Sequence, residues 1–353
     1  YEIVVSDWSS DVCSSDLPAL IPTPVRYFMN LYRMLKGLDQ AIKDWPKVKT
    51  TVKTLQDRSR SAEKILKKRG LGLAPWHNKW AAFHMPPSLP TEPTKSSLCK
   101  QADFLREHHL KWCKIIKREP EFHRKQWEFV YILESLEQRG MIGPGKRGLG
   151  FAVGTEPAPA ALCSFGCEIV ATDINPEAGT EKGWTHGNQL CFGLDDLNRD
   201  GVCDTNTFGR LCSYRPVDMN DIPDDLRDFD FNWSSCSFEH LGSIEKGLTF
   251  LKNQLKTLKP GGWAIHTTEY NISSNDDTLE EENCVIFRHR DIEKVVGELR
   301  AEGHHVEELD YSLGWLPYDY KVDIPPYDLA PHLRLQLSKY VCTSIGLIIR
   351  KKA

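Results

Sequence analysis

The chain has 353 residues, of which 40% are apolar and 27% charged, an ordinary composition for a soluble globular protein. No run approaches the ~18 apolar residues of a membrane span, and eleven irregularly spaced cysteines without a secretory signal argue against a disulfide framework and favour a cytoplasmic protein. The net charge of −4 is unevenly spread, because residues 17–147 sum to +14 and residues 148–353 to −14.

The first third of the chain predicts helices and a basic surface. Tyr1–Leu17 has no helical or strand period and resembles a translated sequencing adapter, so we exclude it from fold and function. Residues 18–121 are expected to form a basic helical region with a proline-rich loop, in which apolar residues recur at helical spacing over Val25–Leu71. The basic surface indicates either an anionic partner or solvated helix faces, of which we favour the second.

A strongly amphipathic segment, His123–Gly140, predicts the helix that leads into the next motif. Because it ends directly before a glycine-rich turn, we expect it to pack beside a ligand site. Arg124, Lys125 and Glu128 fall on its polar side, where they either contact that ligand or simply lie on the surface.

A glycine-rich stretch, Lys146–Asp173, predicts a nucleotide-binding strand, helix and strand. Gly148, Gly150 and Gly154 would form a turn that lets the backbone approach a ligand closely. Asp173 lies at the carboxyl end of the second strand, where an acid can bind ribose hydroxyls. The spacing G-x-G-x-x-x-G differs from the dinucleotide pattern G-x-G-x-x-G. The motif therefore indicates a nucleotide-like ligand but does not identify which one.

Strands and helices alternate in the rest of the chain, which is typical of a doubly wound, mostly parallel sheet. The later strands are predicted at Leu211–Met219, Asp230–Ser237, Trp263–Thr268, Val306–Tyr311 and Cys342–Arg350. A long insertion, residues 312–340, precedes the last strand, which we therefore expect to run antiparallel. A polar loop at Asp196–Thr207 imitates a calcium loop but lacks the acid at its twelfth position, so no metal site is predicted.

Five segments, taken in order, resemble class I S-adenosylmethionine-dependent methyltransferases of the small-molecule type. They are GLGFAVG, VATD, VDMNDIP, FDFNWSSCSFEHLGSI and LKPGGWAIHTTE, of which the last two are the more specific. The resemblance covers residues 122–353 and implies a Rossmann-like methyltransferase domain with S-adenosylmethionine as cofactor. It departs at Ala152, where many members have glycine, and alanine suits that position if its φ is negative.

The resemblance also implies which residues bind the cofactor. They are Gly148, Gly150 and Gly154 beside the methionine part, Asp173 on the ribose, Asp218 and Met219 at the adenine, and Ser234 and Ser235 facing the transferred methyl.

An in-line methyl transfer needs alignment above all, and a hydroxyl acceptor also needs a general base. His240 and Glu239 are our first candidates for that base, and His266 and Glu269 are the second, although each could instead have a structural role.

Several functions remain open from the sequence. We expect methyl transfer to an unidentified small organic acceptor, such as the hydroxyl of a sugar or another metabolite. The basic N-terminal region keeps a nucleic-acid methyltransferase as an alternative, although the I-P-P-Y at residues 324–327 follows the wrong strand for the signature of amino-methylating enzymes. A non-catalytic cofactor-binding module is the other alternative. The glycine spacing disfavours an NAD-dependent oxidoreductase.

Overall fold

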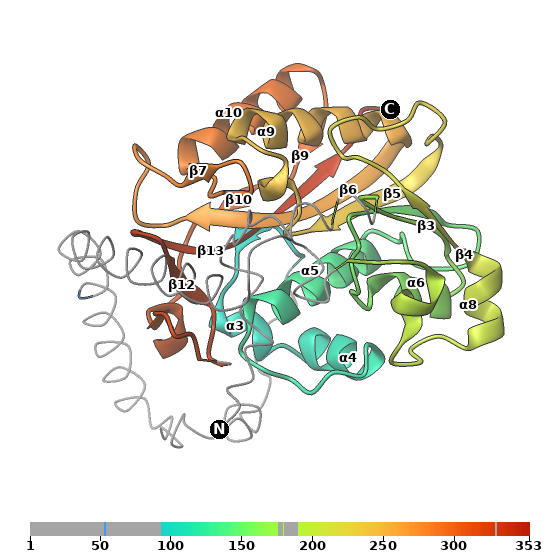
Figure 1. Cartoon of the computed structure of the whole chain (residues 1–353), viewed down its shortest axis with the longest axis horizontal. Coiled ribbons are helices and arrows are strands. Elements are labelled where there is room, and N and C mark those ends of the chain that lie inside the picture. The colour runs from blue at the N-terminus through green and yellow to red at the C-terminus, as the bar shows by residue number, and fades with distance from the viewer. Residues whose placement is uncertain (1–52, 54–92, 176–178, 180–189, 329) are drawn as a thin grey trace, which may run out of the picture.

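The structure is a computed structural model, and it describes residues 53, 93–175, 179, 190–328 and 330–353 (Figure 1). The predicted adapter segment lies outside the described residues, and so do the predicted helices of residues 25–71, apart from Lys53. Within the described ranges, no helix has the length and apolar character needed to cross a bilayer.

The helices and strands follow the predicted order. The helices are α3 (Gln101–Phe104), α4 (Glu107–Ile115), α5 (Arg124–Gln138), α6 (Ala158–Ser164), η2 (Leu194–Asn198), α8 (Thr205–Leu211), η3 (Phe238–His240), α9 (Ile244–Asn253), η4 (Gln254–Thr257), α10 (His289–Ala301) and η5 (Pro317–Asp319). The strands are β1 (Ser96–Leu98), β2 (Arg147–Phe151), β3 (Glu168–Asp173), β4 (Cys212–Pro216), β5 (Phe229–Ser235), β6 (Leu258–Asn271), β7 (Glu280–Glu281), β8 (Cys284–Val285), β9 (His305–Val306), β10 (Leu309–Asp310), β11 (Val322–Asp323), β12 (Arg334–Leu337) and β13 (Tyr340–Arg350).

The central sheet has the predicted doubly wound, mostly parallel arrangement. Its strands follow the order β10-β1-β13-β6-β5-β2-β3-β4. β2 pairs in parallel with β3 on one side and with β5 on the other, whereas β13 runs antiparallel to β6, as predicted. The chain passes from β2 outward to β3 and β4 and then returns to β5, so the strand order reverses beside β2. Ligands of open α/β sheets bind at such a reversal, outside the carboxyl ends of the strands.

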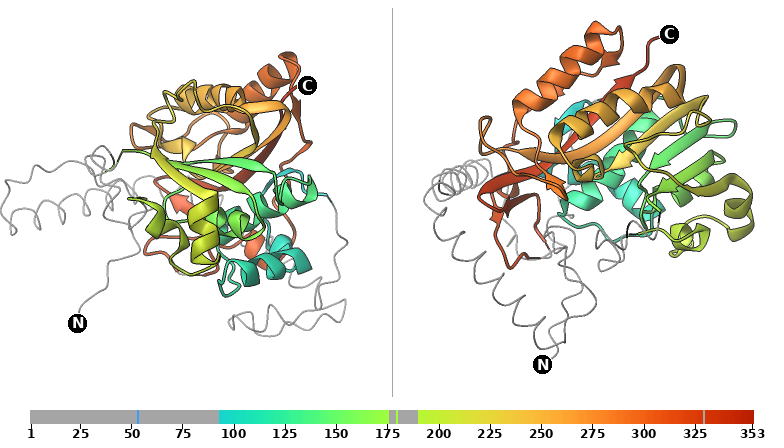
Figure 2. Two further views of the ribbon diagram at one scale, coloured as in Figure 1. Left: turned by 90° about the vertical axis from the view of Figure 1, so that its right-hand side faces the viewer. Right: turned by 45° about the horizontal axis from the view of Figure 1, so that its top comes forward.

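Helices cover both faces of the sheet, with α9 and α10 on one side and α5 and α6 on the other (Figures 1 and 2). β13 contributes side chains to the hydrophobic cores on both faces of the sheet. Ile348 belongs to the hydrophobic core beneath α5, and its neighbours Leu347 and Ile349 belong to the core beneath α9 and α10. Successive side chains of a strand point to opposite faces, so a strand covered on both sides has a nearly continuous apolar sequence.

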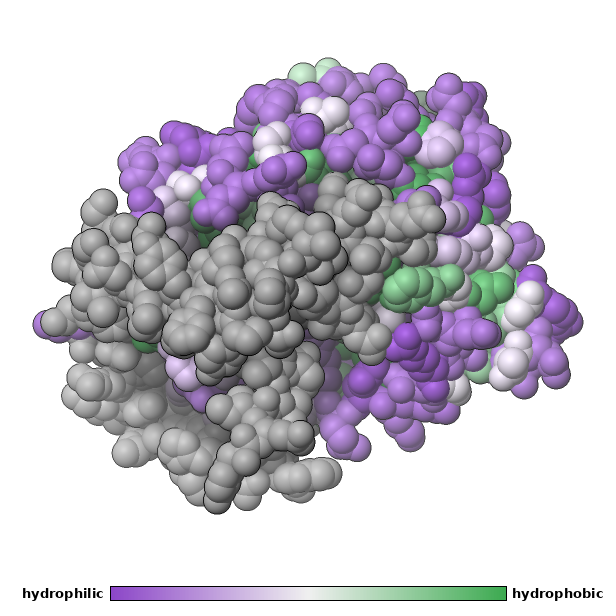
Figure 3. All heavy atoms as spheres, viewed as in Figure 1, coloured by the Kyte–Doolittle hydropathy of each residue, from purple (hydrophilic) through white to green (hydrophobic). Residues whose placement is uncertain are grey.

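Hydrophilic residues cover most of the described surface seen in Figure 3. Few large apolar side chains stand out from it among the described residues; Phe165, Phe192 and Trp315 are the exposed ones. The apolar residues of the described ranges are therefore mainly buried in hydrophobic clusters, and isolated exposed apolar residues are ordinary on a protein surface.

Residues before position 122, where the sequence predicts the domain to begin, also belong to this sheet. β1 pairs in parallel with β10 and antiparallel with β13. Tyr131 of α5 donates from its hydroxyl to the carbonyl of Lys95, 2.8 Å away. The helices α3 and α4 follow β1 directly, and α4 packs against α5.

The predicted insertion, residues 312–340, docks on the start of α5. Its β12 extends the sheet by pairing with β13. His332 donates its backbone N–H to the carbonyl of Phe122 at 2.8 Å, and its own carbonyl accepts from the N–H of Arg124 at 3.0 Å. The insertion is therefore a structural support for the N-terminal turn of α5.

Candidate active site

A cavity of about 460 Å³ lies at the carboxyl edge of the sheet, where the strand order reverses. Ligand pockets commonly have volumes of ~300–1,000 Å³. Its walls come from the turn after β2 (residues 152–157), the ends of β3 and β4, the end of β5 (residues 235–237) and the start of α5. These are the segments in which the sequence predicted ligand contacts, so the fold brings them together around one space.

The backbone turn at this cavity begins at Ala152, later than the sequence suggested. Ala152 has φ = +46° and Gly154 has φ = +50°, so the negative φ that would suit an alanine at position 152 is not observed. A residue other than glycine in this region carries backbone strain, and such residues cluster at functional sites. The turn is held by Gly154, whose N–H donates to Asp173 Oδ2 at 3.0 Å.

Gly148 and Gly150, which the sequence predicts beside the cofactor, lie away from the cavity. Both lie inside β2 and neither lines the cavity. A Cβ on Gly148 would come within 2.4 Å of the Phe231 ring, and a Cβ on Gly150 within 2.5 Å of the Trp233 ring. These glycines therefore make room for aromatic side chains of the neighbouring strand, and of the three predicted glycines only Gly154 reaches the cavity.

Asp173 lines the cavity at the end of β3, as predicted. Its Oδ2 accepts from the N–H groups of Gly154 and Cys191, and its Oδ1 accepts from that of Ile174 at 2.8 Å. Burial raises the pKa of the carboxyl to about 6, against the lowering effect of these three hydrogen bonds. A carboxylate offers about four acceptor positions, so Oδ1 retains capacity for a ligand hydroxyl.

Three further predicted residues line the cavity. Asp218 is exposed and accepts the N–H of Asn220 on Oδ1 at 2.8 Å, and Met219 is buried beside it. Ser235 donates from Oγ to Glu128 Oε2 at 3.2 Å. Ser234 does not line the cavity, because successive residues of a strand face opposite sides; its hydroxyl lies 2.8 Å from His266 Nδ1 in the core.

Of the two first candidates for the general base, only His240 reaches the cavity. Its Nδ1 lies 2.7 Å from the backbone carbonyl of Asn283, which can only accept, so Nδ1 carries the proton and neutral His240 has its lone pair on Nε2. Glu239 is 1% exposed, and its Oε2 accepts from the Thr268 hydroxyl at 2.9 Å. Glu239 does not line the cavity, and its Oε1 lies 4.0 Å from His240 Nε2.

The second candidates are both removed from the cavity. His266 is fully buried within β6, and burial lowers its pKa to about 3, so it is a neutral core histidine. Glu269 Oε1 lies 2.5 Å from Arg124 Nη2 in a buried ion pair. Both residues therefore have structural roles in the described part of the chain.

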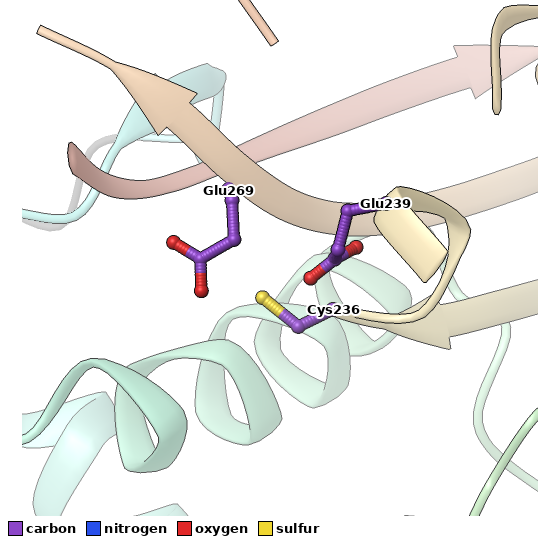
Figure 4. Close-up of side chains that lie close together, drawn as sticks. All are labelled: Cys236, Glu239 and Glu269. Carbon is purple, nitrogen blue, oxygen red and sulfur yellow. The ribbon is translucent and has the colours of Figure 1, made fainter. Parts of the chain in front are cut away.

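Cys236, Glu239 and Glu269 converge from the loop after β5, from η3 and from β6 (Figure 4). Each is buried, and their potential ligand atoms lie within 4.8 Å of one another, as in a metal site. Arg124, however, already supplies a cation there, with Nη1 3.6 Å from Cys236 Sγ and Nη2 2.5 Å from Glu269 Oε1. The cluster is therefore an ion-pair network, and we assign no metal to it.

Glu128, which the sequence predicts on the polar side of its helix, does not line the cavity but bonds to Ser235 and Cys236 of the cavity wall. It is fully buried, and its carboxylate accepts hydrogen bonds from Ser235, Cys236 and Ser344 and an ion pair from Arg124. Arg124 is likewise 1% exposed. The sequence feature that could have predicted this buried pair is the spacing of an arginine and a glutamate four residues apart on one helix. The same spacing is also common in ion pairs on helix surfaces, so it does not indicate burial.

Glu156 is a second residue that the sequence analysis missed. It lines the cavity beside the turn, and its Oε1 accepts from Trp233 Nε1 at 2.6 Å. Burial raises its pKa to about 8, although the Trp233 hydrogen bond acts in the opposite direction. Glu156 therefore holds a proton at neutral pH and presents a neutral acid to the cavity.

Comparisons with known proteins found no matching family model and no matching curated protein. Among solved structures, the chain is similar to an S-adenosylmethionine-dependent methyltransferase from Clostridium acetobutylicum ATCC 824, with a TM-score of 0.38 and 14% identity over 69% of this chain and 97% of that chain. It is also similar to magnesium protoporphyrin IX methyltransferase from Synechocystis PCC 6803 with bound SAH, with a TM-score of 0.39 and 10% identity over 71% and 97% of the two chains. Similarity at these TM-scores does not identify a function, so the function is inferred from the residues that line the cavity.

Proposed function

We propose that this protein transfers a methyl group from S-adenosylmethionine to a small organic acceptor. The observation that carries the proposal is the sequence of groups around one cavity at the strand reversal. The strained turn at residues 152–157, the carboxylate of Asp173, the Asp218–Met219 pair, the end of β5 and His240 all line this cavity.

The chain's own groups fit the parts of this cofactor. Asp173 retains an acceptor position on Oδ1 for ribose hydroxyls. The buried Met219 offers an apolar surface to a purine ring, and the exposed carboxylate of Asp218 can accept from its amino group. The turn around Gly154 brings backbone close to the space where the methionine part would lie.

The residues near the end of β5 would do the work of alignment and proton removal. When bound, S-adenosylmethionine supplies a methyl group already activated by the positive sulfur, whose bond electrons return to sulfur on transfer. Alignment of the reacting atoms can supply ~7–11 kcal/mol of the barrier. For a hydroxyl acceptor, His240 would take the released proton on Nε2, which its Nδ1 contact with Asn283 leaves unprotonated in the neutral ring.

The binding part of the proposal is tested by Asp173→Ala with Asp224→Ala as control, because the Asp224 side chain is 94% exposed. We expect Asp173→Ala to abolish measurable binding of S-adenosylhomocysteine in a calorimetric titration, and Asp224→Ala to leave it unchanged. Thermal unfolding of both variants reports whether the fold persists. An unchanged affinity in a folded Asp173→Ala variant would remove Asp173 from the site.

The acceptor is tested by a turnover screen with labelled methyl donor across classes of acceptor, with RNA among them. We expect product with a small metabolite. Methylation of RNA alone, with binding that weakens steeply as salt rises, would favour the nucleic-acid alternative. Cofactor binding without turnover of any class would favour the non-catalytic module.

A further inference from the structure

His123, the residue immediately before α5, lines the cavity and carries a hydrogen-bond donor on its ring. Its Nδ1 accepts the backbone N–H of Lys125 at 3.1 Å, so in the neutral ring the proton is on Nε2. Burial, and then the neighbouring His332, lower its pKa to about 3, so the ring stays neutral near neutral pH. Nε2 bonds to no atom in the part of the chain that the structure describes, and the ring lines the cavity.

The ring of His123 is fixed by the insertion. It stacks on His332 with ring centroids 4.8 Å apart and an interplanar angle of 19°. His332 Nδ1 lies 2.6 Å from Asp323 Oδ2, and the His332 backbone bonds to the chain on both sides of His123. The donor at Nε2 therefore has a defined direction before any ligand arrives.

Lys125 adds a positive charge to the same wall. Its side chain is 30% exposed, and within the described residues its Nζ makes one ion pair, 3.6 Å from Glu128 Oε2, and no hydrogen bond. Glu128 is already bonded to Arg124 and to three side-chain donors. An ammonium group has three donors, so Lys125 has donors left for a ligand in the cavity.

His240 lines the same cavity, and in its neutral ring Nε2 has a lone pair and acts as a hydrogen-bond acceptor. In the neutral ring of His123, by contrast, Nε2 carries the proton and acts as a donor. We propose that His123 and Lys125 form a carboxylate subsite for the acceptor, which would thus be a hydroxy acid whose hydroxyl faces His240. This substrate class rests on the proposed function. The methionine carboxylate of the cofactor is the other possible source of the same chemistry, and the experiment separates the two.

The test uses three carboxylates and their amides: 4-hydroxybenzoate and 4-hydroxybenzamide, salicylate and salicylamide, lactate and lactamide. Each is titrated calorimetrically into the full chain saturated with S-adenosylhomocysteine. We expect at least one carboxylate to bind about tenfold or more tightly than its amide, because charge-assisted hydrogen bonds are the stronger class. Lys125→Met should remove this difference, Lys125→Arg should keep it, and Lys114→Met, at an exposed position of α4, should leave it intact.

Three results would overturn the subsite. They are amides that bind as tightly as their carboxylates, no binding of any carboxylate at millimolar concentration, and Lys125→Met binding that equals that of the parent. A Lys125→Met variant that loses affinity for S-adenosylhomocysteine, with no discrimination between carboxylates and amides in the parent, would assign the residues to the cofactor and so also overturn the acceptor subsite. If S-adenosylhomocysteine fails to bind the parent, the proposed function fails, and the same pairs titrated into the unliganded protein test the subsite by itself.

Discussion

Glu156 lies between the turn after β2 and the indole of Trp233, and its protonation is set by burial. Its pKa is raised to about 8, whereas an unfolded chain releases this proton near pH ~4.3. Between these two values the folded protein retains a proton that the unfolded chain has lost. The free energy of unfolding must therefore fall as the pH rises through this window.

Glu156→Gln should reverse that loss. Glutamine keeps an acceptor for Trp233 Nε1 and cannot ionise, so we expect the variant to gain about 1–3 kcal/mol over the parent between pH ~5 and pH ~8. Urea unfolding of both proteins at these two pH values measures the gain. An equal difference at both values would show that Glu156 ionises normally in the folded protein.

His240 is expected to act on the acceptor and not on the cofactor. With an acceptor found by the turnover screen, His240→Ala should lower kcat by about 10²-fold or more, the usual range for general-base help. The affinity for S-adenosylhomocysteine should stay within about twofold, since the proposed cofactor contacts come from other segments. His305→Ala, whose side chain is 60% exposed, is the control. Unchanged turnover in His240→Ala would remove it as the base.

Among the elements, the packing of β2 against β5 explains why residues 148 and 150 are glycines, although the sequence predicted both beside the cofactor. Gly148→Ala would place a methyl group 2.4 Å from the Phe231 ring, and overpacking of this kind typically costs ~1–3 kcal/mol. Gly209→Ala in α8 meets open space and should be neutral or stabilising, because alanine favours helix by ~1 kcal/mol. Chemical denaturation of both variants tests this pair, and equal stability of the two would contradict the packing role.

The elements were predictable where a local pattern determines them. The apolar runs of β3, β5 and β13 predicted buried strands, and the long excursion before β13 predicted its reversed direction. The sequence could not separate a glycine that approaches a ligand from one that faces an aromatic ring on another strand. That difference depends on Phe231 and Trp233, which come more than eighty residues later.

At the scale of the whole molecule, the site depends on contacts between distant parts of the chain. Arg124 of α5 pairs with Glu269 of β6, and Glu128 accepts from Ser344 of β13. No local pattern marks such partners, so the sequence predicted Arg124 and Glu128 on the polar side of the helix, in contact with a ligand or on the surface, although both are buried. The position of the cavity was predictable, because strand order alone puts the ends of β2, β3 and β5 at one edge.

Binding of S-adenosylmethionine in this cavity is best tested by calorimetric titration of the full chain with S-adenosylhomocysteine, beside an identical titration with NAD. We expect saturable binding of S-adenosylhomocysteine at one site per chain and no heat of binding with NAD. Saturable binding of NAD, or no binding of S-adenosylhomocysteine, would contradict it.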